Sequence, residues 1–387
     1  MNPMIAQVHS LPGLIRELVP VLDDTVRKTL DHELCLSVKR LYVTGCGDSH
    51  HASLGSELAF ETIAGRPAEP MSALQFARYA AGHLPPTGPG TNLVIGVSVS
   101  GEVARTTEAL RLARQAGAGT LAVTATTGSR LAETAELVIR SSTPPFPEPP
   151  GAHTPGVRSY LASQLALLLI AVRIGEVRGH LDWAAATARR RDILALSEAA
   201  QETVLACDQA ARALAEEWRD ADAFVFVGGG PNYATALFSA AKVLEASGDA
   251  AVGQDTEEWA HLHFFARARS TPTFFITAGE RDLSRAIEVA AAARTIGRRV
   301  VAVAPPSVAA LREVASRILP LADGVPEMLS PVIASIPGAL FAAYRSELLG
   351  EPFFRPTGDG REPGLSRVRT SQMWDAWHVP LDRLDRR

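Results

Sequence analysis

The sequence predicts an α/β protein in which one strand–helix unit occurs twice, each copy forming a parallel sheet covered by helices. Apolar, strand-like runs alternate with segments of helical spacing, which is typical of βαβ units. Residues 108–139 and 288–319 also align without gaps at an offset of 180, which indicates an internal duplication. The identical pairs at this offset include Glu108 and Glu288, Arg114 and Arg294, and Gly117 and Gly297.

Each copy follows the same order of predicted elements. A strand, a glycine turn and a helix come first, in "LYVTGCGDSHHASLGSELAFE" and in "FVFVGGGPNYATALFSAAKVLE". A second strand, an acid-containing turn, a second helix, a glycine and a third strand follow. The resulting segments are an N-terminal helical segment 1–37, a first α/β domain 38–180, a helical connector 181–220, a second α/β domain 221–350 and a C-terminal tail 351–387 over the site.

A proline-rich segment follows the third strand of copy one. It reads "STPPFPEPPGAHTP", residues 142–155, and holds six prolines, so we expect no regular structure there. Ligands bind at the carboxyl edge of open α/β sheets, where this segment begins. It is either a lid or pocket wall, or a rigid surface loop.

Composition and charge narrow the class of protein. The chain has 387 residues, 47% hydrophobic and 21% charged, and a net charge of −4, which gives no reason to expect nucleic acid or an anionic membrane as partner. The most apolar segment, 161–172, is too short to span a bilayer and is flanked by Arg158 and Arg173. Three cysteines without a CxxC motif, and no signal-peptide pattern, favour a reducing compartment, the cytoplasm.

Two serines follow a buried strand of copy one. The turn "SVSGE", residues 98–102, sits between the apolar run 93–97 and the helical segment that follows it. Hydroxyls and free N–H groups at a helix start bind phosphate. The alternative is that Ser100 is an N-cap, but one cap needs one hydroxyl, which leaves Ser98 unexplained.

The matching turns of copy two lack these hydroxyls. Copy two has "TAGE", residues 277–280, in place of SVSGE, and "GGGPN" with Pro231 in place of "GCGDS" with Ser49. Hydroxyls that only capped helices would be needed equally in both copies. The difference therefore favours a phosphate site in copy one alone.

Copy two instead carries candidates for proton transfer. Its first helix ends near Glu245, and "QDTEEWAHLHFF" supplies Glu257, Glu258, His261 and His263. A glutamate and a histidine facing one pocket are suited to general acid–base work. The alternatives are a solvated glutamate and a histidine packed in the core. The HxH pair hints at a metal, but no third ligand is in view, so we expect no metal and no other cofactor.

Together these motifs resemble the sugar isomerase (SIS) domain family. The resemblance rests on GCGDS, SVSGE, GGGPNY with its following helix, and EWAH, in this order and spacing, and covers residues 41–369. It is nearest to the double-SIS isomerase half of glutamine–fructose-6-phosphate aminotransferase. That branch includes SIS-type glucosamine-6-phosphate deaminases and fructosamine-6-phosphate deglycases. The resemblance implies two tandem, flavodoxin-like SIS domains.

The resemblance also implies a set of phosphosugar-binding residues in copy one. The family's first-turn serine falls on Ser49, beside Gly47, and its S-x-S-G-E phosphate loop falls on residues 98–102. The family's middle glutamine is Val99 here, and its threonine after the glutamate is Val103, so Thr106 or Thr107 would compensate. The implied binding residues are Gly47, Ser49, Ser98, Val99, Ser100, Val103 and Thr106.

The catalytic residues that the resemblance implies lie in copy two and in the tail. The family's proton-moving glutamate falls on Glu245, and its ring-opening histidine, sixteen residues later, falls on His261. In relatives this histidine reaches a neighbouring subunit's site, so a homodimer with composite active sites is implied. Arg367 stands nearest the family's C-terminal lysine, and arginine forms no Schiff base. The sequence shows no glutaminase domain, so we expect no ammonia from glutamine through this chain.

The expected function is an enzyme acting on a 6-phosphorylated amino sugar or fructosamine. Losing ammonia would make it a deaminase and losing an amino acid a deglycase, and these two are favoured over a plain aldose–ketose isomerase. The rival class is a phosphosugar-binding regulator without catalysis. Such regulators usually carry one SIS copy and a DNA-binding helix-turn-helix, and no basic recognition helix is evident here.

Overall fold

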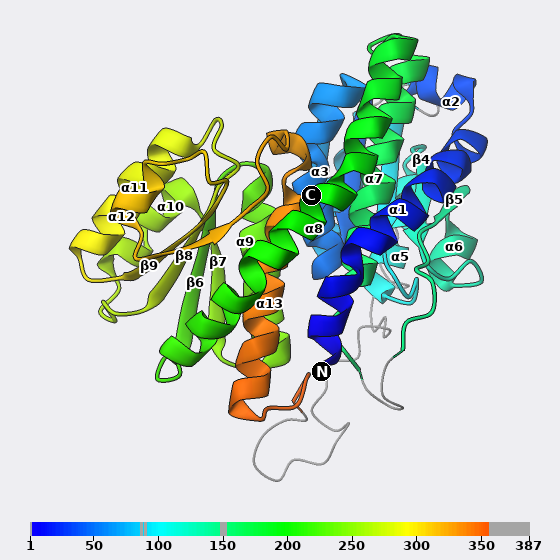
Figure 1. Cartoon of the computed structure of the whole chain (residues 1–387). Coiled ribbons are helices and arrows are strands. Elements are labelled where there is room, and N and C mark those ends of the chain that lie inside the picture. The colour runs from blue at the N-terminus through cyan, green and yellow to red at the C-terminus, as the bar shows by residue number, and fades with distance from the viewer. Residues whose placement is uncertain (1, 86–87, 89–90, 148–152, 356–387) are drawn as a thin grey trace. The chain divides into compact units, whose positions relative to one another are not determined.

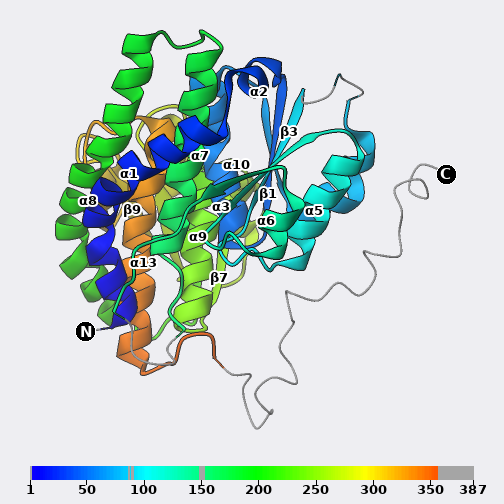
Figure 2. The same cartoon turned by 90° about the vertical axis from the view of Figure 1, so that its right-hand side faces the viewer.

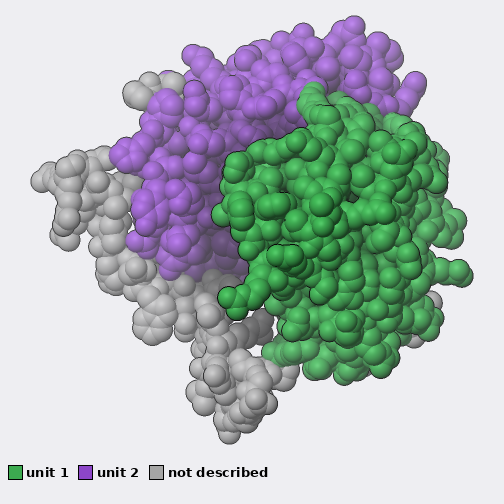
Figure 3. Space-filling view, turned by 90° about the vertical axis from the view of Figure 1, so that its left-hand side faces the viewer, with its two compact units in different colours: residues 1–15, 145–158, 195–366 green, residues 16–144, 159–194, 367–387 purple. Residues whose placement is uncertain are grey.

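The computed structural model describes residues 2–85, 88, 91–147 and 153–355, which divide into two compact units. Unit 2 comprises 16–144 and 159–194 and holds copy one, whereas unit 1 comprises 1–15, 145–158 and 195–366 and holds copy two (Figure 3). Two long helices, α1 (Pro3–Thr29) and α8 (Trp183–Glu217), each contribute residues to both units. The five segments predicted above stay a prediction.

Unit 2 is built on a five-stranded parallel sheet in the order β2-β1-β3-β4-β5. Its strands are β1 (Arg40–Gly45), β2 (Ala68–Ser72), β3 (Asn92–Val97), β4 (Gly119–Thr124) and β5 (Leu137–Arg140). Its helices are α2 (His32–Ser37), α3 (Asp48–Ala59), α4 (Ala73–Gln75), α5 (Ala104–Gln115), α6 (Arg130–Thr134) and α7 (Arg158–Val177), with the short turns η1 (Phe60–Ala64), η2 (Phe76–Ala80) and η3 (Ala81–His83). α5 and α6 cover one face and α3 the other (Figure 2).

Unit 1 repeats this topology in the order β7-β6-β8-β9-β10. Its strands are β6 (Ala223–Gly228), β7 (Ala250–Asp255), β8 (Pro272–Ile276), β9 (Arg299–Ala304) and β10 (Arg317–Pro320). Its helices are α9 (Pro231–Ala246), α10 (Thr256–His261), α11 (Leu283–Thr295), α12 (Leu311–Val314) and α13 (Pro331–Leu349), with η4 (His263–Phe265) and η5 (Glu327–Leu329). α9 and α13 lie on one face, and α10, α11 and α12 on the other (Figure 1). The predicted fold class is confirmed.

The duplication extends to the backbone of the first turns. Gly47 precedes α3 with φ 55° and ψ −130°, and Gly230 precedes α9 with φ 52° and ψ −129°. A positive φ costs glycine little and other residues much, which explains why both copies place glycine there.

The second strands of the two copies also share a register. Gly45 pairs with Ser72 at the end of β2, and Gly228 pairs with Asp255 at the end of β7. Both residues cap the next helical turn, because the Ser72 hydroxyl accepts a hydrogen bond from Gln75 N and the Asp255 carboxylate accepts from Glu257 N. Ser72 and Asp255 are therefore equivalent positions, and residues at the same distance after them correspond in the two copies.

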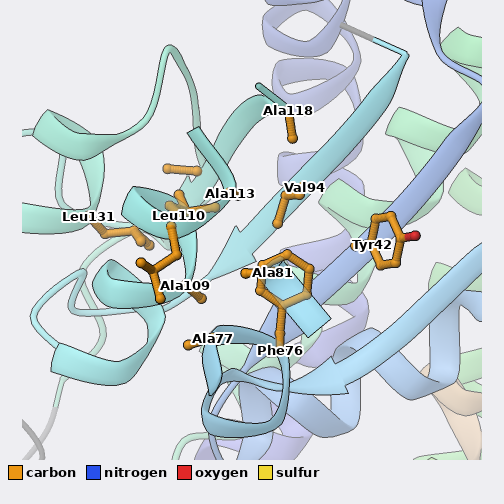
Figure 4. Close-up of a cluster of buried hydrophobic side chains, with 12 residues drawn as sticks. Tyr42, Phe76, Ala77, Ala81, Val94, Ala109, Leu110, Ala113, Ala118 and Leu131 are labelled. Atoms are coloured by element: carbon orange, nitrogen blue, oxygen red, sulfur yellow. The ribbon is translucent and has the colours of Figure 1, made fainter. Parts of the chain in front are cut away.

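The core of unit 2 lies between its sheet and α5. Ala109, Leu110 and Ala113 on α5 face Val94 of β3, while Phe76 packs on Tyr42 at 5.7 Å between ring centroids (Figure 4). In copy two the position of Phe76, four residues after the cap, is taken by Trp259, which is equally buried and packs on Phe275 at 5.9 Å. Both copies thus hold the helical turn after their second strand with a buried aromatic side chain.

Two helices of the protein are long and strongly apolar. Among the described residues, α7 has 20 residues and α13 has 19, and both are long and apolar enough to cross a membrane by length and composition. Their apolar windows are 89% and 83% buried inside the protein, however, as expected for core helices. The expectation that segment 161–172 is too short must therefore be corrected, because it belongs to a longer helix.

The proline-rich segment has no regular structure where it is described. Residues 142–147 and 153–155 form neither helix nor strand, as predicted, and 148–152 lie outside the described residues. Whether this segment is a lid or a surface loop stays a prediction.

Candidate functional site

The strand order of unit 2 creates a crevice position between β1 and β3. The chain leaves β1 toward β2 on one side and β3 toward β4 on the other, and ligands of open α/β sheets bind at such a switch point, outside the carboxyl ends of the strands. The GCGDS turn follows β1, and the SVSGE turn follows β3. The two turns adjoin, because a Cβ on Gly45 would lie 3.0 Å from the carbonyl oxygen of Val97.

Neither serine of the SVSGE turn caps α5. The Ser98 hydroxyl is buried and accepts from Gly101 N at 3.2 Å, and the exposed Ser100 hydroxyl accepts from Glu102 N at 3.2 Å. α5 begins at Ala104 with Val103 as N-cap, which makes no side-chain capping bond. The N-cap alternative is therefore wrong. The N-cap residue of α5 thus supplies no side-chain acceptor, and a helix start of this kind favours an anion.

Glu102 holds the turn in place rather than facing a ligand. Its carboxylate accepts from Arg130 N at 3.1 Å and from Arg130 Nε at 2.8 Å, and these bonds lower its pKa. Gly101 has φ 68°, and a Cβ there would lie 1.9 Å from the Ser129 hydroxyl. Glycine is thus required for the turn to close against the start of α6.

The first turn of unit 2 meets α5 through Cys46. Thr106 Oγ1 lies 4.0 Å from Cys46 Sγ, and Ser49 N donates to Cys46 O at 3.2 Å. Gly47 and Ser49 therefore lie in the turn that contacts Thr106 of α5, and this turn adjoins the one that holds Ser98. The carbonyl of Val99 accepts from Ala125 N at 3.0 Å, so this residue contributes backbone to the same edge.

Sequence reasoning missed three polar side chains in the first turn of α3. His51 Nδ1 lies 3.7 Å from Asp48 Oδ1. Burial, together with the neighbouring His51, lowers the pKa of His50 to about 4, so its imidazole is neutral at physiological pH. The signal was present as "DSHH" directly after the glycine turn.

In copy two the side chain of Asp282 lies at the equivalent switch point. Thr277 Oγ1 donates to Asp282 Oδ1 at 2.5 Å, and a Cβ on Gly229 would lie 3.0 Å from Asp282 Oδ2. The Asp282 side chain therefore lies between the two turns. Burial raises its pKa to about 6. A carboxyl group at this place disfavours a phosphate.

Glu245 lies in the last turn of α9 and is paired with a buried lysine. Lys242 Nζ donates to Glu245 Oε2, and the lysine side chain is fully buried over the Phe238 ring at 5.0 Å. The Glu245 carbonyl accepts from Phe354 N at 2.8 Å. Lys242 was missed by sequence reasoning, although its spacing of three from Glu245 on a helix was a usable signal.

His261 ends α10 and is 65% exposed. Its Nε2 lies 3.1 Å from Glu257 Oε1, and the Glu257 carboxylate accepts from Arg285 Nε at 2.6 Å and Nη2 at 2.9 Å. Burial lowers the pKa of His263, which disfavours its charged form. Among the described residues no group of three or more His, Cys, Asp or Glu side chains has metal-ligand geometry.

Glu245 and His261 lie at opposite ends of strand β7 of the unit 1 sheet. Glu245 is reached before β7 begins, whereas His261 follows the carboxyl end of β7. Six residues of strand span about 20 Å. The fold of unit 1 therefore does not bring the two predicted catalytic residues together. Arg367 lies outside the described residues.

Comparisons with known proteins identify relatives of the chain. Residues 36–173 match the SIS domain family. The chain is 32% identical over 350 residues to glutamine–fructose-6-phosphate aminotransferase (isomerizing) of Gloeobacter violaceus, covering 88% of this chain and 55% of that protein. It is 29% identical over 367 residues to the Halobacterium salinarum protein of the same name, covering 91% and 57%. The chain thus spans little more than half the length of these relatives.

Solved structures share the fold. The C-terminal domain of glucosamine-fructose-6-phosphate aminotransferase from Francisella tularensis superimposes with a TM-score of 0.78 at 18% identity, covering 92% of this chain and 98% of that one. Glucosamine-6-phosphate deaminase from Thermotoga maritima gives 0.66 at 16% identity, covering 90% and 96%. Tagatose-6-phosphate ketose/aldose isomerase from Escherichia coli gives 0.70 at 16%, covering 92% and 95%.

Proposed function

We propose that this chain, whose residues 36–173 match the SIS domain family, is an enzyme acting on a 6-phosphorylated amino sugar or fructosamine. The single observation that supports the substrate class most is the contrast between the two switch points. Copy one offers hydroxyls and an uncapped helix start, and copy two offers the Asp282 carboxyl group.

Phosphate binding is assigned in this proposal to the turns of unit 2. Ser49, Ser98 and Ser100, with the N–H groups at the start of α5, would hold the 6-phosphate, and Thr106 would complete this edge. A fixed phosphate orients the sugar so that its reacting carbons meet the acid–base groups.

Proton transfer is assigned to Glu245 and His261. His261 would assist ring opening and protonate the departing group, and Glu245 would move the carbon-bound proton through an enediol or enolamine. Arg367 would hold a substrate oxygen or the phosphate, since arginine forms no Schiff base.

A homodimer with composite sites is part of the proposal. Glu245 and His261 lie at opposite ends of strand β7 of the unit 1 sheet, so a site that uses both needs a residue from another subunit. Leu262 and Phe265, one and four residues after His261, are exposed apolar side chains of the kind that a subunit interface covers. The free state of Cys35, Cys46 and Cys207 supports a cytoplasmic location.

The reaction is a deamination or a deglycation in this proposal, with plain aldose–ketose isomerisation as the second candidate. The test is a panel of glucosamine 6-phosphate, fructose 6-phosphate and 6-phosphorylated fructosamines in D₂O. Mass spectrometry follows deuterium uptake at C1 or C2, and separate assays follow released ammonia and amino acid. Ammonia release identifies a deaminase, amino acid release a deglycase, and exchange with ketose formation alone an isomerase. Binding without exchange or product would favour the non-catalytic regulator and contradict the enzyme.

A further inference from the structure

A chain of charged side chains joins α10 to α11 around His261. Glu257 lies one helical turn before His261, and its carboxylate is gripped by two nitrogens of Arg285, the third residue of α11. Arg285 Nη1 also contacts Glu288 Oε2 at 2.7 Å. The Arg285 side chain is therefore held between two carboxylates and fixes Glu257 in turn, since a bidentate arginine–carboxylate pair allows little freedom.

This arrangement selects one tautomer of the imidazole. An ionised carboxylate only accepts hydrogen bonds, so the ring nitrogen that faces Glu257 Oε1 must carry the proton. That nitrogen is Nε2, which leaves the lone pair of the neutral ring on Nδ1. The bonds from Arg285 and His261 lower the pKa of Glu257, so the carboxylate stays ionised.

Copy one shows that the scaffold uses this position for contacts between the same two elements. Six residues after their caps, Arg78 in copy one stands where His261 stands in copy two. Arg78 contacts the side chain of Glu108 on α5 at 2.7 Å, and Arg105 contacts the same carboxylate. At the offset of 180, Arg105 and Glu108 correspond to Arg285 and Glu288.

The side chain six residues after the cap contacts a different partner in each copy. In copy one Arg78 contacts Glu108 directly, whereas in copy two Glu257 stands between His261 and Arg285. An acid has thus been placed next to a group able to exchange protons, the arrangement that orients histidine in acid–base catalysis.

We propose that Glu257, held by Arg285, is the positioning residue of His261 and makes Nδ1 the nitrogen that exchanges a proton with the sugar. This inference rests on the proposed function, in which His261 opens the sugar ring. Nδ1 would take the proton of the anomeric hydroxyl while the O–H electron pair forms the carbonyl. The bond from the anomeric carbon to the ring oxygen would break with its pair on that oxygen, which would then take the proton back from Nδ1.

The tautomer can be measured without any substrate. In the full chain, ¹⁵N-histidine correlation spectra at neutral pH distinguish a proton on Nε2 from one on Nδ1, and His261→Gln identifies the signals of His261. We expect wild type to carry the proton on Nε2. In Glu257→Gln, Arg285 takes the amide oxygen, so the amide NH₂ faces the ring and the proton moves to Nδ1. A wild-type ring protonated on Nδ1 would overturn the proposal.

Kinetics supply the second measurement, with fructose 6-phosphate and glucosamine 6-phosphate as probes of deuterium exchange. We expect Glu257→Gln to lower kcat by about tenfold with KM unchanged, a part of the 10²- to 10⁴-fold that acid–base catalysis supplies. Arg285→Ala should lower kcat in the same direction, and Arg285→Lys should restore part of the loss. Glu258→Gln is the matched control, because Glu258 is the exposed neighbour on the same turn and should retain wild-type rates.

The outcomes separate this proposal from the proposed function. If Glu257→Gln behaves like Glu258→Gln while His261→Gln is inactive, the positioning role is wrong and the role of His261 stands. If His261→Gln keeps the full exchange rate, the assignment of His261 and this proposal both fail. A raised KM with unchanged kcat in Glu257→Gln would also overturn the positioning role, since it would indicate a binding contact.

Discussion

The two copies of the duplication differ at the switch points that they share. In copy one the turns after β1 and β3 carry Ser49, Ser98 and Ser100, and α5 begins without a side-chain cap. In copy two the equivalent space holds the side chain of Asp282, bound to Thr277. One backbone thus offers hydrogen-bond donors in one copy and a carboxyl group in the other. In the proposed function, a few side chains in the turns, rather than the fold, decide which copy would bind the phosphate.

The same contrast recurs beside each switch point. In copy one the buried Glu108 lies between two arginines, Arg78 and Arg105, so positive charge is in excess. In copy two Arg285 lies between two glutamates, so negative charge is in excess around His261. In the proposed function, positive charge would suit the binding of an anion in copy one, and a carboxylate beside a histidine would suit proton transfer in copy two.

Substitution of Glu245 should have the largest effect on the proton transfer proposed for copy two. We expect Glu245→Gln to lower turnover by about 10³-fold while leaving phosphosugar binding intact, because general acid–base groups supply factors of this size. The glutamine oxygen still accepts from Lys242, but this buried ammonium loses the Glu245 carboxylate, so the variant should also be less stable than wild type. Turnover and the Kd from calorimetry are the measurements, with the melting curve as control. Normal turnover in this variant would show that copy two does not supply the proton-moving glutamate.

Glu108 and Glu288 form a matched pair that tests the role of burial. Glu108 is 1% exposed and Glu288 is 69% exposed, although they occupy equivalent positions. Glu108→Gln should lower the free energy of unfolding by about 3 kcal/mol, because two arginines lose a buried carboxylate. Glu288→Gln should change it by less than about 0.5 kcal/mol, as for a surface pair. Urea unfolding of both variants measures this, and equal losses would contradict the contrast.

Asp282 and His50 should give opposite pH dependences of stability. The folded pKa of Asp282 is raised to about 6 from 3.8, so the folded state holds the proton longer and stability falls as pH rises from about 4 to 6. The folded pKa of His50 is lowered from 6.5 to about 4, so the unfolded state binds more protons and stability rises between about pH 4 and 6.5. Each effect is about 3 kcal/mol at most.

Two variants separate these pH effects in urea unfolding at several pH values. Asp282→Asn removes the loss of stability that Asp282 causes as the pH rises. The stability of this variant should therefore rise more steeply with pH than that of wild type. His50→Gln removes the gain of stability that His50 causes as the pH rises. The slope of stability against pH should therefore be more negative in this variant than in wild type. Slopes that shift in the same direction for both variants would show that one of the two groups is not buried as described.

Removal of a single serine hydroxyl from the SVSGE turn of copy one should have the smallest effect of these substitutions. Ser98→Ala and Ser100→Ala should each weaken phosphosugar binding by about tenfold, the loss expected for one hydrogen bond to a charged group. Thr277→Ala is the control, because the same hydroxyl chemistry in copy two should be irrelevant to the phosphate. Calorimetry with fructose 6-phosphate measures the Kd. A larger loss in Thr277→Ala than in Ser98→Ala would reverse the assignment of the two copies.

Local patterns were sufficient for the fold class, and the turn motifs pointed to the same sheet edge. The alternation of strands and helices, the repeat at 180 and the glycines at positions 47 and 230 are read within short windows, and the structure has them all. The N-cap interpretation of Ser100 was wrong, because α5 begins one turn later than the serine pattern indicated. The length of α7 was underestimated, because Arg158 and Arg173 were read as boundaries although both lie within the helix.

The residue pattern alone therefore established a duplicated α/β protein with asymmetric turns, because periodicity and turn chemistry are properties of neighbouring residues. The tertiary structure decided which side chains meet across those turns. Asp282 lies against Gly229 and Arg78 against Glu108 because a parallel sheet in the order 2-1-3-4-5 places segments far apart in the sequence side by side. The tertiary structure also placed Glu245 near the amino ends of the strands of unit 1 and His261 near their carboxyl ends. The reason is that a helix that follows a parallel strand runs back toward the end at which that strand began.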